Sequence, residues 1–220
     1  MVTNNSLTEE NYLKAIFHLS QRGLKKTSPT AIAEELKVNT ASVVEMIRKL
    51  VEKKLITYEK TKGVKLSEKG QKLALGIVRL HRLWEVFLLS KLEYTWDHVH
   101  EIAEQLEHVK HHELANRLDK FLGYPEYDPH GDPIPKASGE LPKLSNTLLS
   151  ESEPGKSYRV AAVKDTSVPF LQYLQQLSIN IGCRIKVIKK IEFDGSMVIK
   201  VNKEDTATVS NKLAANILVN

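Results

Sequence analysis

The stretch that decides the fold is SPTAIAEELKVNTASVVEMIRKLVEKKLITYEKTKGVKL, residues 28–66. Ser28 and Pro29 are typical of a helix start, and they predict a short helix from Thr30 to Leu36. A polar turn separates it from a second helix, from about Thr40 to Lys53, whose apolar residues recur at helical spacing. Two helices joined by such a short turn are typical of a DNA-reading unit.

Two short strands are predicted directly after the second helix. The segments Ile56–Glu59 and Val64–Leu66 flank the turn Thr61-Lys62-Gly63. We interpret this hairpin as a wing, whose basic tip suits a contact with phosphate or the minor groove. An amphipathic helix over residues 8–21 precedes both, so we expect a winged helix-turn-helix DNA-binding domain over residues 1–75.

The expected DNA contacts lie at the start of the second helix and on the wing. The first turns of a recognition helix face the major groove, where Ser42 and Glu45 can reach base edges. Basic side chains on this helix and on the wing suit phosphates. Because long polar side chains are few, DNA shape is expected to contribute to specificity. The predicted set is Thr40, Ala41, Ser42, Glu45, Arg48, Lys49, Lys60 and Lys62.

Histidines and carboxylates gather in the middle of the chain. Seven of the eight histidines lie between residues 81 and 130. We expect a helix over residues 68–92, which carries His81-x3-Glu85, and another from Trp96 to about His111, which carries His100-x3-Glu104-x2-Glu107-His108. On helices these spacings bring the side chains onto common faces. Imidazoles and carboxylates arranged in this way suit a divalent transition metal.

The same segment predicts an association between two copies of the chain. Residues 113–122 either continue the second of these helices or form a separate short one, and the apolar positions of these helices exceed what one helix pair can bury. We therefore expect a helical metal-binding and dimerisation domain over residues 76–142.

The charge distribution favours a polyanion as the partner of the N-terminal part and a cation as the ligand of the middle part. Residues 1–75 carry 14 Lys+Arg against 8 Asp+Glu, whereas residues 76–150 carry 8 against 12. No apolar run reaches the roughly 18 residues of a membrane span, and the start lacks the features of a signal peptide. The single Cys183 cannot form an internal disulfide. We expect a cytoplasmic protein without membrane contact.

The last third of the chain predicts a separate small β domain. Prolines punctuate residues 123–154, and we place a Pro-containing tether at 143–154. Residues 155–220 then alternate like strands, with a short helix at 168–178 and a hairpin turn at Asp194-Gly195. The expected fold class is mainly α, with the winged helix-turn-helix first, the helical domain second and a small SH3-like β-barrel last.

Several stretches together resemble the DtxR/MntR family of metal-dependent transcriptional repressors. They are TEENYLKAI at the start, AIAEELKVNTASVVEMIRKLVEKKLITYEKTKGVKLSEKG, HRLWE at 81–85, VHEIAEQLEHV at 99–109 and GDPIP at 131–135. The resemblance covers most of residues 6–142, and the barrel is similar to the FeoA-like third domain of the longer members. It implies a repressor of metal-homeostasis genes that binds a palindromic operator as a metal-activated homodimer.

The resemblance also implies a regulatory metal site. Glu104, Glu107 and His108 match three of its ligands, and Asn11 stands where manganese-type members have Asp and iron-type members have Met. Glu104 occupies a position that is Cys in iron-type members. A carboxylate there makes the site harder, which favours Mn²⁺, with Fe²⁺ as the alternative. Co²⁺ and Zn²⁺ are expected to bind in vitro.

A second, ancillary site follows from the same resemblance. Its matching residues are His81, Glu85 and His100. In some members the barrel adds oxygen ligands, and Asp165 is the nearest carboxylate to the expected positions.

Other functions fit parts of the sequence less well. His100-Glu101-x2-Glu104 comes close to the H-E-x-x-H metallopeptidase motif but lacks the second histidine. With no Gly-rich phosphate loop and no nucleophile elbow, we do not expect an enzyme. A winged-helix regulator that responds to a small organic ligand, and a dual activator and repressor, both remain open alternatives.

Overall fold

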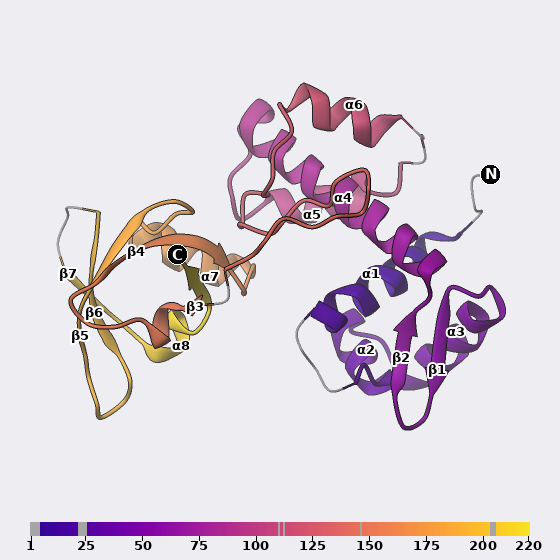
Figure 1. Ribbon diagram of the computed structural model, residues 1–220, viewed down its shortest axis with the longest axis horizontal. Coiled ribbons are helices and arrows are strands. Elements are labelled where there is room, and N and C mark those ends of the chain that lie inside the picture. The colour runs from indigo at the N-terminus through magenta and orange to yellow at the C-terminus, as the bar shows by residue number, and fades with distance from the viewer. Residues whose placement is uncertain (1–4, 22–25, 110, 112, 146, 203–205) are drawn as a thin grey trace. The chain divides into compact units, whose positions relative to one another are not determined.

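The computed structural model describes residues 5–21, 26–109, 111, 113–145, 147–202 and 206–220. The chain forms two compact units (Figure 1). The first consists of Met1–His81, Glu107–His112 and Pro135–Glu140, and the second of Arg82–Leu106, Glu113–Ile134 and Leu141–Asn220. Within the described residues, every helix is too short or too polar to cross a membrane.

The first unit begins with three helices and a hairpin, as the sequence predicts. The elements are α1 (Leu7–Gln21), α2 (Pro29–Leu36), α3 (Thr40–Glu52), β1 (Ile56–Glu59) and β2 (Gly63–Leu66), followed by α4 (Glu68–Leu92), whose N-terminal half belongs to this unit (Figure 1). Local capping explains the helix starts. The Ser28 side chain accepts a hydrogen bond from the Ala31 amide, and Asn39 caps α3 through the Ser42 amide at 2.8 Å.

Apolar side chains of the three helices and of both strands are buried inside this unit. Leu13, Ile16 and Phe17 of α1 are fully buried, and Ile32 and Leu50 from α2 and α3 are buried with them. Removal of this apolar surface from water is what holds three short helices together, because each helix alone is marginal in water.

The second unit contains α5 (Val99–Leu106), which is shorter than predicted. The expected helix from Trp96 to about His111 is wrong at both ends within the described residues, which omit Lys110 and His112. Before α5, the chain turns and Trp96 enters an apolar core instead. After α5, Glu107 and His108 lie in a turn. Therefore, they do not continue the helical face of His100 and Glu104.

The rest of the second unit is α6 (Leu114–Phe121) and an antiparallel sheet. Its strand order is β3-β8-β4-β5-β6-β7. The elements are β3 (Thr147–Leu148), η1 (Leu149–Glu151), β4 (Ser157–Val163), α7 (Val168–Gln176), β5 (Arg184–Lys190), β6 (Met197–Val201), β7 (Thr206–Val209), α8 (Asn211–Ala214) and β8 (Ile217–Val219) (Figure 1). Part of the expected tether is thus in the sheet, because Thr147–Leu148 pairs with β8. The elements β7 and α8 were not predicted from the sequence.

The helical segments and the sheet share contacts within this second unit. Trp96 is buried in the core of the sheet domain, and its neighbour Asp97 accepts a 3.0 Å hydrogen bond from the Gln172 amide on α7. Gly131 has a φ of +87°, and a Cβ there would lie 2.1 Å from the backbone oxygen of Ala161 on β4. The loop that contains Gly131 therefore packs closely against strand β4.

We expect Gly131→Ala to be much more destabilising than Gly123→Ala. Both glycines have a positive φ, but a Cβ at Gly123 would meet no atom within 4 Å. Gly123→Ala should lower the free energy of unfolding only by the cost of a left-handed backbone conformation, roughly 1–2 kcal/mol. Gly131→Ala should lower the free energy of unfolding by about 1–3 kcal/mol more, because the loop must move away from β4. Chemical denaturation of both variants measures the difference, and equal losses would contradict this packing.

Candidate metal sites and DNA-binding surface

In the first unit, α1 meets the turn that follows α5. His108 Nδ1 lies 2.7 Å from Glu10 Oε2 on α1, and its Nε2 lies 3.6 Å from Glu107 Oε1. The Glu107 side chain is fully buried. Two of the four predicted regulatory ligands, Glu107 and His108, are thus adjacent and face α1.

Glu107 is surrounded by positively charged or titratable groups. The Lys14 ammonium donates to both of its carboxylate oxygens at 2.8 Å. The His81 ring lies 2.5 Å from Glu107 Oε2 through Nδ1. A carboxylate buried without such partners would be costly, because a charge loses its hydration.

Among the described residues, Asn11 has one of the few buried side-chain polar atoms without a hydrogen-bond partner. Its side-chain Oδ1 is buried and has no hydrogen-bond partner among the described residues. A buried acceptor left unsatisfied costs about 1–3 kcal/mol, so such atoms are rare unless something else binds them. An amide oxygen on α1, with a carboxylate and an imidazole in the same unit, is a donor set that fits Mn²⁺ or Fe²⁺.

The remaining predicted ligands fall in different units. Glu104, the fourth regulatory ligand, lies half-buried on α5 in the second unit. Of the ancillary set, His81 belongs to the first unit, whereas Glu85 and His100 belong to the second. There, His100 Nδ1 lies 3.1 Å from Glu85 Oε1, and His100 Nε2 lies 3.6 Å from Glu104 Oε1.

A second cluster includes two residues that the sequence analysis did not assign. Glu85, Asp128 and His130 are all buried, and each offers a ligand atom within 4.8 Å of the others. His130 Nδ1 lies 3.6 Å from Glu85 Oε2. The motif Asp128-Pro129-His130 was the available signal, because it places a carboxylate and an imidazole two residues apart. Asp165 is not in this group.

The electrostatics of this second cluster favour a cation. Burial, together with the negative charges of Glu85 and Asp132, raises the pKa of Asp128 well above its usual value. Burial disfavours the charged form of His130, but the hydrogen bond and charge of Glu85 outweigh it and raise the pKa of His130. The positive charges of Arg82 and His130 oppose this rise in the pKa of Asp128. Several acidic groups in one buried place therefore compete for positive charge.

The predicted DNA-binding residues all lie on the surface. Each of the six on α3 and both lysines of the β1–β2 tip are exposed. Lys49 lies 3.2 Å from Glu9, and Lys62 pairs with Glu59 at 2.7 Å on the hairpin.

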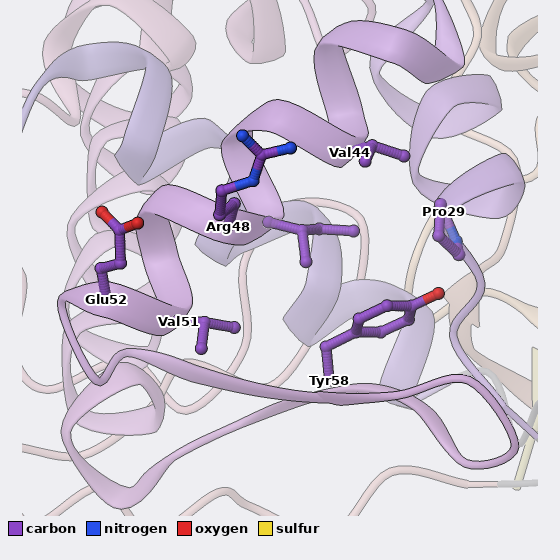
Figure 2. Close-up of a pocket in the computed structure, with 7 residues that line it drawn as sticks. Pro29, Val44, Arg48, Val51, Glu52 and Tyr58 are labelled. Atoms are coloured by element: carbon purple, nitrogen blue, oxygen red, sulfur yellow. The ribbon is translucent and has the colours of Figure 1, made fainter.

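An open, mostly apolar hollow of about 330 Å³ lies on the same surface. Figure 2 shows Val44, Arg48 and Val51 along α3, with Tyr58 of β1 across from them. Arg48 is also a predicted phosphate contact, so an occupant of this hollow would compete with DNA rather than act from a separate site.

Glu9 joins α1 to α3 inside the first unit. Its buried carboxylate lies 2.8 Å from the Lys53 ammonium, and it also accepts the Ser6 amide at 3.0 Å, as in a capping box. Burial opposes its ionisation, but the hydrogen bonds from Lys53, Ser6 and Lys49 dominate and lower the pKa of Glu9. The helix that carries Asn11 is thus tied to the helix that carries the predicted DNA contacts.

Comparison with known protein families finds a match for most of the chain. Residues 6–64 match the N-terminal DNA binding domain of the iron dependent repressors. Residues 67–136 match the metal binding and dimerisation domain of the same repressors. Residues 147–220 match the FeoA domain.

Individual relatives point the same way. The chain is 34% identical over 128 residues to the diphtheria toxin repressor of Corynebacterium jeikeium, covering 58% of this chain and 53% of that protein. It is 33% identical over 128 residues to the iron-dependent repressor IdeR of Mycobacterium bovis, covering 58% and 55%. The matched stretch thus spans about half the length of these curated relatives.

Solved structures match over nearly the full length. A manganese-dependent transcriptional repressor in complex with manganese superposes with a TM-score of 0.87 at 35% identity, covering 96% of this chain and 98% of that one. ScaR with bound Zn²⁺ gives a TM-score of 0.80 at 31% identity, covering 96% and 98%.

Replacing Glu9 by Gln should weaken the connection between α1 and α3. We expect the free energy of unfolding at pH 7 to fall by about 1.5–3 kcal/mol, the usual contribution of a hydrogen bond to a charged group. Because the folded-state pKa of Glu9 lies below its usual value of 4.5, this contribution is present above that pH and is lost as the pH falls through the folded-state pKa.

The matched control is Glu59→Gln, whose ion pair with Lys62 is largely exposed. Exposed pairs contribute about 0–1 kcal/mol, so its stability should hardly change. Denaturant titrations at pH 7 and at pH 3 test both statements. A Glu9→Gln loss that stayed constant over this pH range would contradict the role of the ionised carboxylate.

Proposed function

Because the chain belongs to the DtxR/MntR family of metal-dependent transcriptional repressors, we propose that it represses transcription by binding a palindromic operator as a metal-activated homodimer. The observation that carries this proposal is the unpartnered, buried Asn11 Oδ1 on α1, in the unit where Glu107 and His108 also face α1. The proposed ion is Mn²⁺, with Fe²⁺ as the alternative, because the donors are oxygen and imidazole nitrogen only. The controlled genes would serve metal homeostasis.

Asn11, Glu107 and His108 would hold the regulatory ion, with Glu104 as the expected fourth ligand. When bound, the ion supplies the positive charge that joins the donors of α1 to those of the turn after α5. The chain itself transmits that constraint, since Glu9 connects α1 to Lys53 at the end of α3. A fixed α1 therefore fixes the recognition helix of the proposed winged helix-turn-helix.

In the dimer, a fixed orientation of the recognition helix increases the affinity for DNA. Two copies related by a two-fold axis place their recognition helices at one separation, which must match one turn of DNA. If α1 is free to adopt several orientations, only a fraction of the protein has the correct separation, and the apparent affinity falls by that fraction.

DNA contacts are proposed for the exposed residues of α3 and of the hairpin tip. Ser42 and Glu45 would meet base edges, and Arg48 with the tip lysines would meet phosphates. The apolar hollow beside Val44 and Tyr58 adds a surface that can follow DNA shape or contact thymine methyl groups.

A second ion is proposed for Glu85, Asp128 and His130. This set shares Glu85 with the expected ancillary site, and His100 of that expected site lies next to Glu85. The support is electrostatic as well as geometric, because the three ligand atoms lie within 4.8 Å of one another and burial beside other acidic groups raises the pKa of Asp128.

The regulatory site is tested by the double variant Glu107→Ala with His108→Ala. Operator binding measured by fluorescence anisotropy, with the protein's own upstream DNA, should lose its dependence on Mn²⁺. Affinity should fall to the non-specific level, roughly 10³-fold or more weaker. The control is Glu101→Ala with His98→Ala, an exposed pair in the second unit. Retained metal-dependent binding by the first variant would refute the assignment.

The second site is tested by Glu85→Gln with Asp128→Asn. The asparagine keeps the oxygen that accepts the His130 and Asp132 amides at 2.8 and 3.0 Å, so the loop should stay folded. Calorimetric titration with Mn²⁺ should show about one ion fewer per chain than the wild type. An unchanged stoichiometry would rule out these residues as ligands.

A further inference from the structure

Lys14 brings a positive charge into the proposed regulatory site. Its ammonium lies 2.8 Å from both oxygens of Glu107, and the two side chains are 10% and 0% exposed. We propose that Lys14 is a resident cation of this site, which holds Glu107 in the metal-free protein and thereby sets the metal concentration at which the site fills. The inference rests on the proposed function, since it requires Glu107 to be a ligand.

The Lys14 ammonium lies where a cation chelated by both oxygens of the Glu107 carboxylate would lie. It bridges the two oxygens of Glu107, while His81 Nδ1 lies 2.5 Å from Oε2. The Oε1 atom also faces His108 Nε2 at 3.6 Å, which is too long for a hydrogen bond. A divalent ion on Glu107 must therefore either use Oε1 alone or displace the ammonium.

Both possibilities make ion binding less favourable than it would be without Lys14. If the ammonium stays, it repels an ion held on the same carboxylate, and this repulsion is strong where water is excluded. If it leaves, its two hydrogen bonds to Glu107 must be broken first. The free energy of metal binding is reduced in either case, and the response moves to a higher metal concentration.

The position of Lys14 on α1 adds a structural consequence. It lies three residues after Asn11 and four after Glu10, so one helix presents the proposed amide ligand and the opposing cation on neighbouring positions. Stability alone does not account for a lysine here, because a buried ion pair contributes little compared with packed apolar side chains of similar volume. A role in metal binding accounts for both the positive charge of Lys14 and its position on α1.

The test is Lys14→Met in the full-length, metal-stripped protein. To isolate the regulatory site, the titrations use the Glu85→Gln/Asp128→Asn background. Calorimetry with Mn²⁺ should give at least tenfold tighter binding for Lys14→Met. Without metal, its melting temperature should fall by roughly 5–10 °C, because Glu107 then lacks its counter-charge.

Two variants serve as matched controls. Lys14→Arg keeps a cation on Glu107, so it should not show the gain in Mn²⁺ affinity that is expected for Lys14→Met. Lys65→Met makes the same substitution at an exposed site of β2, and neither affinity nor melting temperature should change. If Lys14→Met cannot be purified without metal, Lys14→Gln keeps a hydrogen-bond donor without the charge, and the same gain in affinity is expected.

Glu107→Gln separates a failure of this inference from a failure of the proposed function. If Glu107→Gln abolishes Mn²⁺ binding but Lys14→Met and Lys14→Gln bind no tighter than the parent, only the role of Lys14 is overturned. If Glu107→Gln keeps the parent affinity, Glu107 is not a ligand and the proposed regulatory site fails with it. With the role of Lys14 correct, adding Lys14→Met to Glu107→Gln should not restore binding.

Discussion

The burial of the Glu107 carboxylate is the constraint on which the first unit depends. A charge removed from water needs partners within hydrogen-bond distance, and the chain supplies them from α1 and α4, through Lys14 and His81. Residues 107–109 belong with these partners to the compact unit of α1, α2 and α3, whereas α5, which ends at Leu106, belongs to the other unit.

A second buried carboxylate, that of Glu9, connects α1 to the end of α3 inside the unit. Glu9 and Glu107 both contact lysines, but the lysines belong to different elements: Lys53 follows α3, and Lys14 lies on α1. Helix α1 is therefore held at two places, near its start by Lys49 and Lys53 at the end of α3 and near its middle by the turn after α5. A change of partner at Glu107 therefore acts on a helix that is itself connected to α3 through Glu9.

Sequence reasoning succeeded where structure is set by neighbouring residues. The caps at Ser28 and Asn39 and the periodicity of α1, α2 and α3 are local signals, and these helices were predicted to within one residue at most ends. The ends of α5 could not be predicted, because they depend on partners distant in the chain. Trp96 packs in the core of the sheet domain, and Glu107 binds a lysine 93 residues away. His130 was missed for the same reason, since its partner Glu85 is on another element.

The sheet domain has a role in the second cluster that its sequence did not suggest. The backbone oxygen of His130 accepts the Val163 amide of β4 at 3.0 Å, and the ring of His130 stacks on Trp96, which is itself buried in that domain. Gly131 permits this approach, since any side chain there would collide with β4. Strand β4 thus fixes the position of His130 relative to Glu85. A domain that contributes none of the three acidic or imidazole groups of the cluster still determines its geometry, because ligand groups bind an ion well only when their positions are held by the residues behind them.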